Sequence, residues 1–325
     1  MEVHRYRIKP QSGFATPLRS DTLYGHLLWA AAVLEGEERV GALIDSFTEG
    51  SPAFILSSAF PAGYLPKPPL PGIPRERFKD QFADKGNLFE KLQLYKKYRK
   101  TLYWSLDTWQ SLNGAISQEL LFSTWLSENA GHEKAKRIKD PADDIISAYR
   151  PHVSIDRSSG GVLQQGGLFF SEGTWYRPGL GLDLYVKTDD RAAFEKLLDH
   201  LKSVGFGANR TIGMGQFDYF RDEDFDANTF NIKGTHELSL SVCASEEMTG
   251  FDGYWLPMVK HGRAWSGFGE TNPFKKPFFA FAEGSLFRRM PASGYLLRNI
   301  HSDPRIVQVG WPMTIPLTLE GHHAD

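Results

Sequence analysis

The apolar positions in the N-terminal part of the chain change from a spacing of two to a helical spacing and back again. Residues 3–9 alternate apolar side chains with basic ones, which predicts a half-buried strand with a basic outer face. Residues 20–34 repeat apolar side chains at helical spacing and predict a helix, for which Ser20 is a candidate N-cap. Residues 53–60 predict a second strand, which completes a β-α-β order.

A second set of elements follows after a long interruption. Residues 150–170 predict a β-hairpin, residues 182–186 a strand, residues 189–204 a helix, and residues 216–220 a further strand. Together with the first elements this gives βαββαβ, the order of a ferredoxin-like (RRM-like) domain. The interruption, about residues 75–148, is predicted to be a large helical insertion.

The remainder of the chain predicts a second, smaller unit. Residues 236–244 and 307–317 alternate as strands do, and a charged linker precedes them. We interpret residues 234–325 as a degenerate ferredoxin-like domain, which leaves residues 1–233 for the N-terminal domain with its insertion and hairpin. The predicted fold class is α+β, with two ferredoxin-like domains.

The insertion is basic and aromatic at its start. Residues 75–100 contain nine Lys or Arg against four Asp or Glu, with tyrosines between the cations, and residues 134–139 form a further basic run. Charge of this kind most often marks solvated helices, so the pattern alone favours a solvated insertion over a binding surface.

A glycine-rich loop over residues 205–215 is the most distinctive stretch. Four glycines flank the polar pair Asn209-Arg210 between a predicted helix and a predicted strand. Walker and dinucleotide loops open a helix, so this order of elements excludes both. The loop could hold a phosphate through its backbone N–H groups and Arg210, or it could be a glycine-rich turn that ends the helix.

Composition narrows the choice of function. The chain is 41% hydrophobic with a net charge of −2, so a nucleic-acid site would be a local groove rather than a basic coat. Cys243 is the one cysteine, which indicates a reducing, cytoplasmic location. No apolar stretch is long enough for a membrane span, and no zinc or P-loop motif is present, so we expect no metal and no cofactor.

Several motifs together resemble a known family. The chain is similar to the RAMP superfamily, and within it to the Cas-five-like subunit, subunit four of the type III-A CRISPR effector (Csm) complex. The motifs are Thr16-Pro17-Leu18 before Ser20-Asp21-Thr22-Leu23-Tyr24-Gly25, Leu65-Pro66-Lys67-Pro68, His152-x-x-Ile155-Asp156-Arg157 with Gly167-Leu168-Phe169, Gly205-x-Gly207-x-x-Arg210-x-x-Gly213-x-Gly215, and Phe281-Ala282-Glu283-Gly284-Ser285.

The resemblance implies a noncatalytic subunit that binds and caps the 5′ handle of CRISPR RNA (crRNA). It also implies contacts with the large polymerase-like subunit and the first backbone RAMP subunit. The hairpin would be a thumb that intrudes on the duplex between guide and target RNA. The expected RNA-binding residues are Ser20, Asp21, Thr22, Gly25, His26, Arg150, His152, Arg157, Ser158, Gly205, Gly207, Ala208, Asn209, Arg210, Thr211, Gly213, Gly215, Lys275, Lys276, Gly284 and Ser285.

Several of these residues also have simpler interpretations. Asp21 could be a helix cap, His152 a half-buried strand residue, and the lysine pair at 275–276 ordinary surface. A metal-independent CRISPR RNA-processing endoribonuclease of the same superfamily would need a histidine with a second acid or base, for which His4, His26 and His152 are candidates. The sequence is also compatible with a pure assembly subunit and with the equivalent type III-B subunit.

Overall fold

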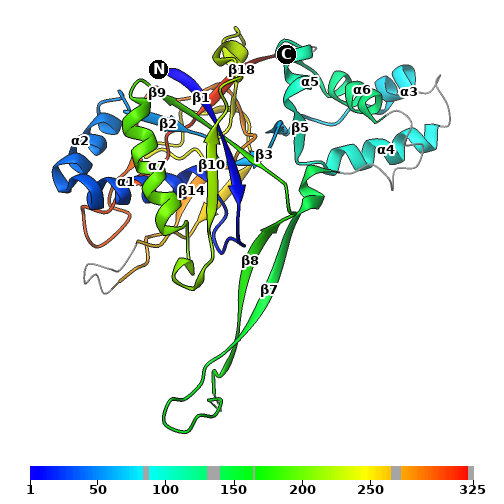
Figure 1. Cartoon of the computed structure of the whole chain (residues 1–325). Helices are drawn as coiled ribbons and strands as arrows, with labels where there is room; N and C mark the ends of the chain where they lie inside the picture. The colour runs from blue at the N-terminus through cyan, green and yellow to red at the C-terminus, as the bar shows by residue number, and fades with distance from the viewer. Residues whose placement is uncertain (83–87, 130–139, 164, 265–271, 321–325) are drawn as a thin grey trace.

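The computed structural model describes residues 1–82, 88–129, 140–163, 165–264 and 272–320. Its N-terminal half is built on an antiparallel sheet with the strand order β10-β1-β9-β2, which β3 extends by pairing with β9 (Figure 1). The strands are β1 (Glu2–Pro10), β2 (Phe54–Leu56), β3 (Phe60–Pro61), β9 (Leu182–Thr188) and β10 (Phe217–Arg221).

Three helices accompany this sheet: α1 (Ser20–Glu35), α2 (Glu37–Thr48) and α7 (Arg191–Val204). α7 forms because its apolar residues recur at helical spacing and are buried, while the Asp190 side chain accepts from the Ala193 N–H at its start. Between residues 2 and 221 the elements of this sheet and its helices follow one another as β1-α1-α2-β2-β3 and, after the insertion and the hairpin, β9-α7-β10, which is a mixed α+β arrangement.

Two details of these elements differ from the prediction. Residues 53–60 form two short strands, because the Ser58 N–H donates to Leu240 and the Ala59 N–H to Leu18, away from β9. Ser20 is the first helical residue rather than the N-cap; Arg19 is the N-cap, without a side-chain cap. The prediction for Ser20 as a cap was wrong.

Two of the three basic residues on the outer face of β1 are paired with carboxylates of the same chain. The Arg5 guanidinium lies 2.6 Å from Asp222 and 4.7 Å from the Phe225 ring centroid. Arg7 lies 2.6 Å from Asp183, whose side chain is fully buried. Arg5 and Arg7 of the predicted outer face are therefore ion-paired within the chain, whereas Lys9 is exposed, and η5 (Ala227–Phe230) in the linker contacts β1.

The C-terminal part is built mainly on a second sheet, with the order β12-β15-β11-β18-β6. Within described residues 234–264 and 272–320 there is no helix, so the alternation expected of a second ferredoxin-like domain is not seen. β6 (Ala115–Ile116) comes from the insertion and runs parallel to β18. The other strands are β11 (His236–Ser239), β12 (Asp252–Tyr254), β13 (Pro257–Lys260), β14 (Phe278–Phe281), β15 (Leu286–Arg289), β16 (Leu296–Leu297), β17 (Gln308–Val309) and β18 (Thr314–Leu319).

The insertion is a small helical unit beside the two sheets (Figure 1). Its tyrosines form a core rather than a surface, since the Tyr95 and Tyr98 rings lie 5.0 and 5.4 Å from that of Phe122. The basic run at 134–139 lies outside the described residues. The elements are β4 (Tyr64–Pro66), α3 (Arg75–Phe82), α4 (Leu88–Lys100), β5 (Tyr103–Ser105), α5 (Leu106–Ser111), α6 (Gln118–Glu128) and η3 (Pro141–Asp144).

The predicted hairpin is longer than expected. β7 (Ile145–Val153) pairs with β8 (Leu168–Tyr176) along its whole length and projects away from the body (Figure 1). Its base is attached to the body by two reciprocal backbone hydrogen bonds of 2.8 Å between Phe14 and Thr174. Among the described residues, no helix is both long and apolar enough to cross a membrane.

Candidate nucleic-acid interface

The glycine-rich loop joins α7 to β10 through an unusual backbone path. Gly205, Gly207, Gly213 and Gly215 all have φ between 71° and 84°, and Asn209 has φ 62°. Glycine adopts such angles without the steric cost that a Cβ imposes, which explains the loop composition. A 3-10 turn, η4 (Arg210–Ile212), forms the tip of the loop.

Most backbone N–H groups of the loop are already used within the chain. Gly207 donates to His26 Nε2 at 3.2 Å, Ala208 to Thr16 Oγ1 at 3.1 Å, and Gly215 to the Gly13 carbonyl at 2.8 Å. The expectation that the whole loop offers its N–H groups to a phosphate was therefore too broad. Among hydrogen bonds between described residues, the N–H groups of Asn209 and Thr211 donate none.

His26 holds the loop against α1. Its ring lies 4.7 Å from that of Phe206, and its Nε2 accepts from Gly207, so that nitrogen carries no proton. Burial, followed by the nearby positive charge of Arg210, lowers the pKa of His26 to about 4. The neutral ring is therefore part of the loop's support.

Acid should weaken this support. The pKa of His26 is about 4 in the folded chain and 6.5 ordinarily, so below pH 6.5 the unfolded chain binds the proton first. We therefore expect the free energy of unfolding to fall by about 2–3 kcal/mol on account of His26 as the pH falls from 6.5 to 4. The variant His26→Gln should lack this part of the pH dependence. Urea unfolding of both proteins across this range measures it; parallel losses would contradict the assignment.

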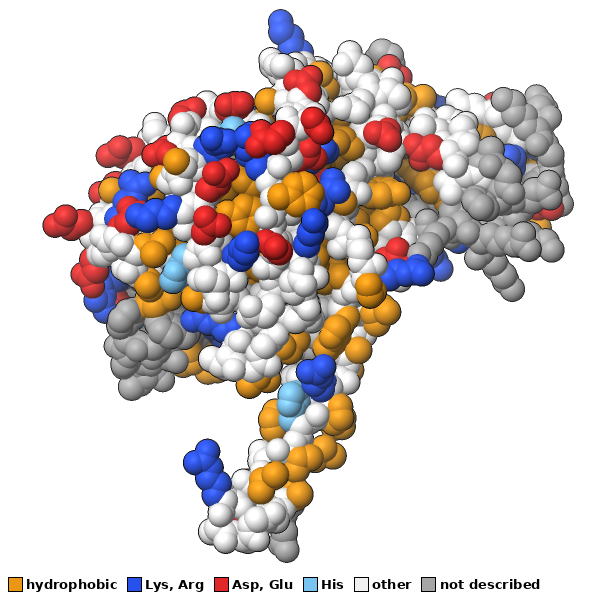
Figure 2. All heavy atoms as spheres, in the orientation of Figure 1, with side chains coloured by type: hydrophobic (Ala, Val, Ile, Leu, Met, Phe, Trp, Pro, Cys, Tyr) orange, Lys and Arg blue, Asp and Glu red, His pale blue; other side chains and the backbone are white. Residues whose placement is uncertain are grey.

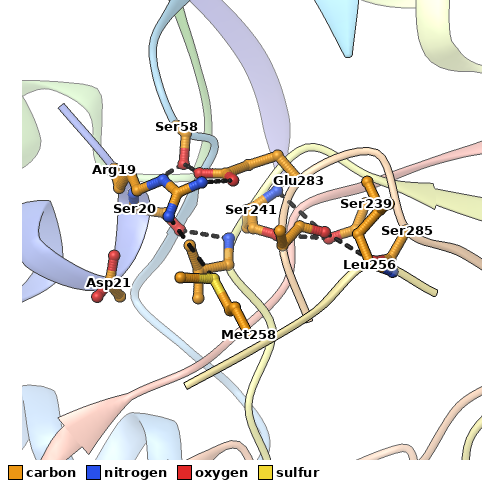
Figure 3. A network of polar contacts seen from close by, with 12 residues as sticks. Arg19, Ser20, Asp21, Ser58, Ser239, Ser241, Leu256, Met258, Glu283 and Ser285 are labelled. Atoms are coloured by element: carbon orange, nitrogen blue, oxygen red, sulfur yellow. Dashed lines mark hydrogen bonds and ion pairs between the residues drawn. The ribbon is translucent and has the colours of Figure 1, made fainter. Parts of the chain in front are cut away.

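Ser20 and Asp21, at the start of α1, are buried, and Ser20 belongs to a network of polar contacts (Figure 3). Ser20 Oγ accepts from the Val242 N–H at 2.8 Å, and the Ser20 N–H donates to Ser58 Oγ at 2.9 Å. Asp21 is 5% exposed and lies 2.8 Å from Lys260 Nζ. Ser20 and Asp21 therefore join the two halves of the chain and are not accessible to RNA.

Three predicted residues of the C-terminal part belong to the same internal structure. Ser285 is buried and its Oγ accepts from the Leu256 N–H at 3.0 Å, while a Cβ on Gly284 would lie 2.9 Å from the Lys67 carbonyl. Lys275 Nζ donates to the Val307 carbonyl at 2.9 Å, and burial lowers its pKa to about 8. These contacts give the three residues structural roles within the chain. Lys276, in contrast, is exposed.

Glu283 is the centre of this network; it lies in a motif found in the sequence but was not among the expected RNA-binding residues. Its carboxylate accepts from Ser58 Oγ and lies 3.0 Å from the Arg19 guanidinium (Figure 3). We expect Glu283→Ala to lower the free energy of unfolding by about 2–3 kcal/mol, because it leaves a partly buried guanidinium unpaired. Glu38→Ala, at an exposed position of α2, should change it by less than about 0.5 kcal/mol in the same denaturation experiment. Equal effects would contradict the role.

The hairpin carries four further predicted residues. His152 is stacked on Phe169 with ring centroids 5.0 Å apart, and its Nε2 lies 2.7 Å from Ser171 Oγ. The Arg150 guanidinium lies 5.7 Å from the Trp175 ring centroid, on the same side of the ribbon. Arg157 and Ser158 are exposed at the tip, where Ser158 is bound to Asp156.

The structure thus brings one group of the predicted residues together. The tip of the glycine-rich loop carries exposed Asn209 and Thr211 and half-buried Arg210, and His26 of α1 holds this loop. Gly25, next to His26 on α1, is exposed, with open space where a Cβ would lie. Thr22 lies one turn before His26 on α1. The sequence analysis assigned no site role to four residues that act as supports: Arg19 and Ser58, and Thr16 and Glu283, which lie in the family motifs.

Comparisons with known proteins agree with this architecture. A family model described as the RAMP superfamily matches residues 10–218, more than half of the chain. The chain belongs to the RAMP superfamily.

More particular likenesses point to one kind of RAMP protein. The chain is similar to the CRISPR system Cms protein Csm4 of Streptococcus thermophilus, with 25% identity over 277 residues, which cover 81% of this chain and 79% of that protein. Its fold matches a chain of the Csm3-Csm4 subcomplex in the type III-A CRISPR-Cas interference complex, with TM-score 0.57, 16% identity, and coverage of 97% and 99%. It also matches a chain of the Csm1-Csm4 cassette in complex with cA4, with TM-score 0.56, 16% identity, and coverage of 98% and 100%.

Proposed function

We propose that this chain is a noncatalytic subunit of a type III-A CRISPR interference complex, where it binds and caps the 5′ handle of the crRNA. The observation that carries the proposal is the likeness to Csm4 along most of both proteins, together with the fold match to chains from Csm3-Csm4 and Csm1-Csm4 assemblies. In this role the chain contacts a large subunit of the Csm1 kind and a backbone subunit of the Csm3 kind.

The tip of the glycine loop is the proposed contact for the handle. Two N–H groups that have no acceptor among the described residues belong to Asn209 and Thr211, the residues that flank Arg210 in the chain. Guanidinium and N–H donors suit a phosphate, and the Asn209 amide suits a base edge. Gly25 leaves room for the RNA backbone beside the loop.

The hairpin is the proposed thumb. Its Arg150, His152 and Ser171 lie on one side of the ribbon together with the Phe169 ring, which is the mixture of donors and aromatic rings that binds unpaired bases. Arg157 at the tip adds a positive charge where the ribbon reaches farthest. We propose that this side meets the end of the duplex between guide and target RNA.

The geometry favours binding over RNA cleavage. A ribonuclease of this superfamily would need a histidine free to exchange a proton with the 2′-OH. His26 is held neutral by Gly207, and His152 is paired with Ser171 on the hairpin. His4 lies at the end of the sheet where β9 leads into α7, away from the glycine loop that follows α7.

Incubation of the purified chain with handle-containing RNA in EDTA tests this conclusion. We expect the RNA to be bound and to stay intact. Site-specific cleavage that disappears in His26→Ala or His152→Ala would make the chain a processing endoribonuclease instead. A co-purification experiment tests the assignment to a type III-A complex. The chain should co-purify with Csm1-type and Csm3-type partners rather than with the corresponding type III-B subunits.

A further inference from the structure

The two-stranded ribbon of β13 and β14 has one covered side and one open side. On the covered side, Lys260 Nζ lies 2.8 Å from Asp21 at the start of α1, and the partner of Lys260 across the ribbon, Phe278, is buried. Cross-strand partners share a side of a ribbon, and successive residues alternate between sides. Val259 and its partner Phe279 therefore point away from α1, where they are 58% and 43% exposed.

The open side continues beyond the paired strands. Lys275 points inward to the Val307 carbonyl, and a Cβ on Gly262 would lie 3.1 Å from the Lys275 side chain, so both residues belong to the covered side. Their neighbours Arg263 and Phe274, which form an isolated bridge pair, point outward, and the guanidinium lies 4.8 Å from the ring centroid. The outer face of the ribbon is defined here as Val259, Arg263, Phe274, Lys276 and Phe279.

The charges of the ribbon indicate what the outer face binds. Described residues 257–264 and 272–281 contain four Lys or Arg and no Asp or Glu, although the whole chain has a net charge of −2. Arg263 and Lys276 are exposed, and neither has a carboxylate partner among the described residues. Figure 2 shows the Asp and Glu side chains mainly over the upper part of the body, and few along its lower edge, where Figure 1 places β14. Exposed rings beside unpaired positive charges are suited to single-stranded RNA.

The ribbon and the glycine loop contact the same helix. β13 meets α1 at Asp21 and the loop meets it at His26, about 7.5 Å farther along the axis at 1.5 Å per residue. At about 100° per residue, Thr22 and Gly25 fall between Asp21 and His26 around the helix. Because Gly25 leaves open space there, an RNA strand held at the loop has a path across α1 toward the ribbon.

We propose that the outer face of the ribbon is a second site for single-stranded RNA, where bases stack on the Arg263–Phe274 pair and on Phe279 while Lys276 contacts a phosphate. This rests on the proposed function, which brings RNA to the glycine loop. Guanidinium and aromatic planes stack on any base, so the site does not select a sequence. Two strands have this chemistry: the crRNA beyond its handle, and a separate unpaired RNA.

Two pairs of a cation and an exposed ring give matched variants. Arg263→Ser with Phe274→Ser removes such a pair from the outer face. Lys9→Ser with Phe220→Ser removes one from β1 and β10, where Lys9 Nζ lies 4.6 Å from the ring centroid. All four side chains lie outside the buried cores, so both variants should keep the wild-type melting temperature. Lys276→Ser, at a single exposed position, tests the site without altering a ring.

Anisotropy should compare three RNAs: the handle alone, the handle extended by about eight guide nucleotides, and an unrelated single strand as long as the extension. We expect the Arg263/Phe274 variant to bind the handle alone within about twofold of the wild type and the extended RNA about tenfold more weakly. Lys276→Ser should make the negative salt slope for the extended RNA less steep by about 0.7. A tenfold loss for the unrelated strand, without one for the extended RNA, would assign the site to a separate RNA.

Unchanged affinities of the Arg263/Phe274 variant for all three RNAs overturn the second site, as does an equal loss in the Lys9/Phe220 variant. A variant that keeps its RNA affinities but no longer co-purifies with a partner subunit also overturns it, because the face would then be a protein interface. A wild type that binds the handle as tightly as the extended RNA, and does not bind the unrelated strand, overturns this site alone. One that binds none of the three contradicts the proposed function as well.

Discussion

Replacing Gly215 by alanine is expected to lower the free energy of unfolding by about 3 kcal/mol or more. Gly215 has φ 71°, and a Cβ there would lie 1.9 Å from the Phe206 carbonyl oxygen. The backbone of the two residues is held in place, because the Phe206 N–H donates to the Gly215 carbonyl oxygen at 2.9 Å. The chain can admit the methyl group only by moving the loop away from Phe206.

Gly213→Ala is the matched control for this effect. Gly213 has φ 84°, but nothing lies within 4 Å of a Cβ at that position, so the variant meets backbone strain without a clash. We expect it to cost about 1–2 kcal/mol. Urea denaturation with unchanged m-values compares the two. Equal losses would show that the close approach to Phe206 does not organise the loop.

Arg210→Ala is expected to weaken binding of handle-containing RNA about tenfold or more. A hydrogen bond to a charged group contributes about 1.5–3 kcal/mol, and about 1.4 kcal/mol corresponds to a factor of ten. If Arg210 neutralises one phosphate of single-stranded RNA, the negative slope of log affinity against log salt concentration should also become less steep by about 0.7 in the variant. Anisotropy titrations at several salt concentrations measure both quantities.

Arg191→Ala controls for the loss of a positive charge. Arg191 begins α7, the same helix that leads into the loop at its other end, and its side chain is 45% exposed. Its removal should leave the affinity within about twofold and the slope unchanged. Equal effects of the two arginines would show that RNA responds to the overall charge rather than to the loop.

The sequence predicted those elements whose apolar spacing is long and regular. α1, α7 and the strands β1, β9 and β10 were placed within a few residues of their observed ends. α2 was missed, although Val40, Leu43, Ile44 and Phe47 recur at helical spacing and would have indicated it. The second ferredoxin-like unit was inferred from alternating strands, which do not indicate whether helices connect them.

The site was predicted less well than the fold, because accessibility depends on distant partners. Glycines showed where the backbone of the loop could turn, but not that Gly13, Thr16 and His26 would take its N–H groups. The sequence predicted Ser20 to be a helix N-cap and an RNA-binding residue. Its actual partner is Val242, 222 residues farther along the chain, and no local pattern reveals such a contact.

The most direct test of the central claim is the affinity of the wild-type chain for a crRNA 5′ handle. Two RNAs of equal length and base composition should be compared by anisotropy at the same salt concentration, one with the native handle and one with its sequence scrambled. We predict that the native handle binds at least tenfold more tightly and that Arg210→Ala reduces this preference. Equal affinity for the two RNAs, unaffected by Arg210→Ala, would contradict a handle-binding role for the glycine loop.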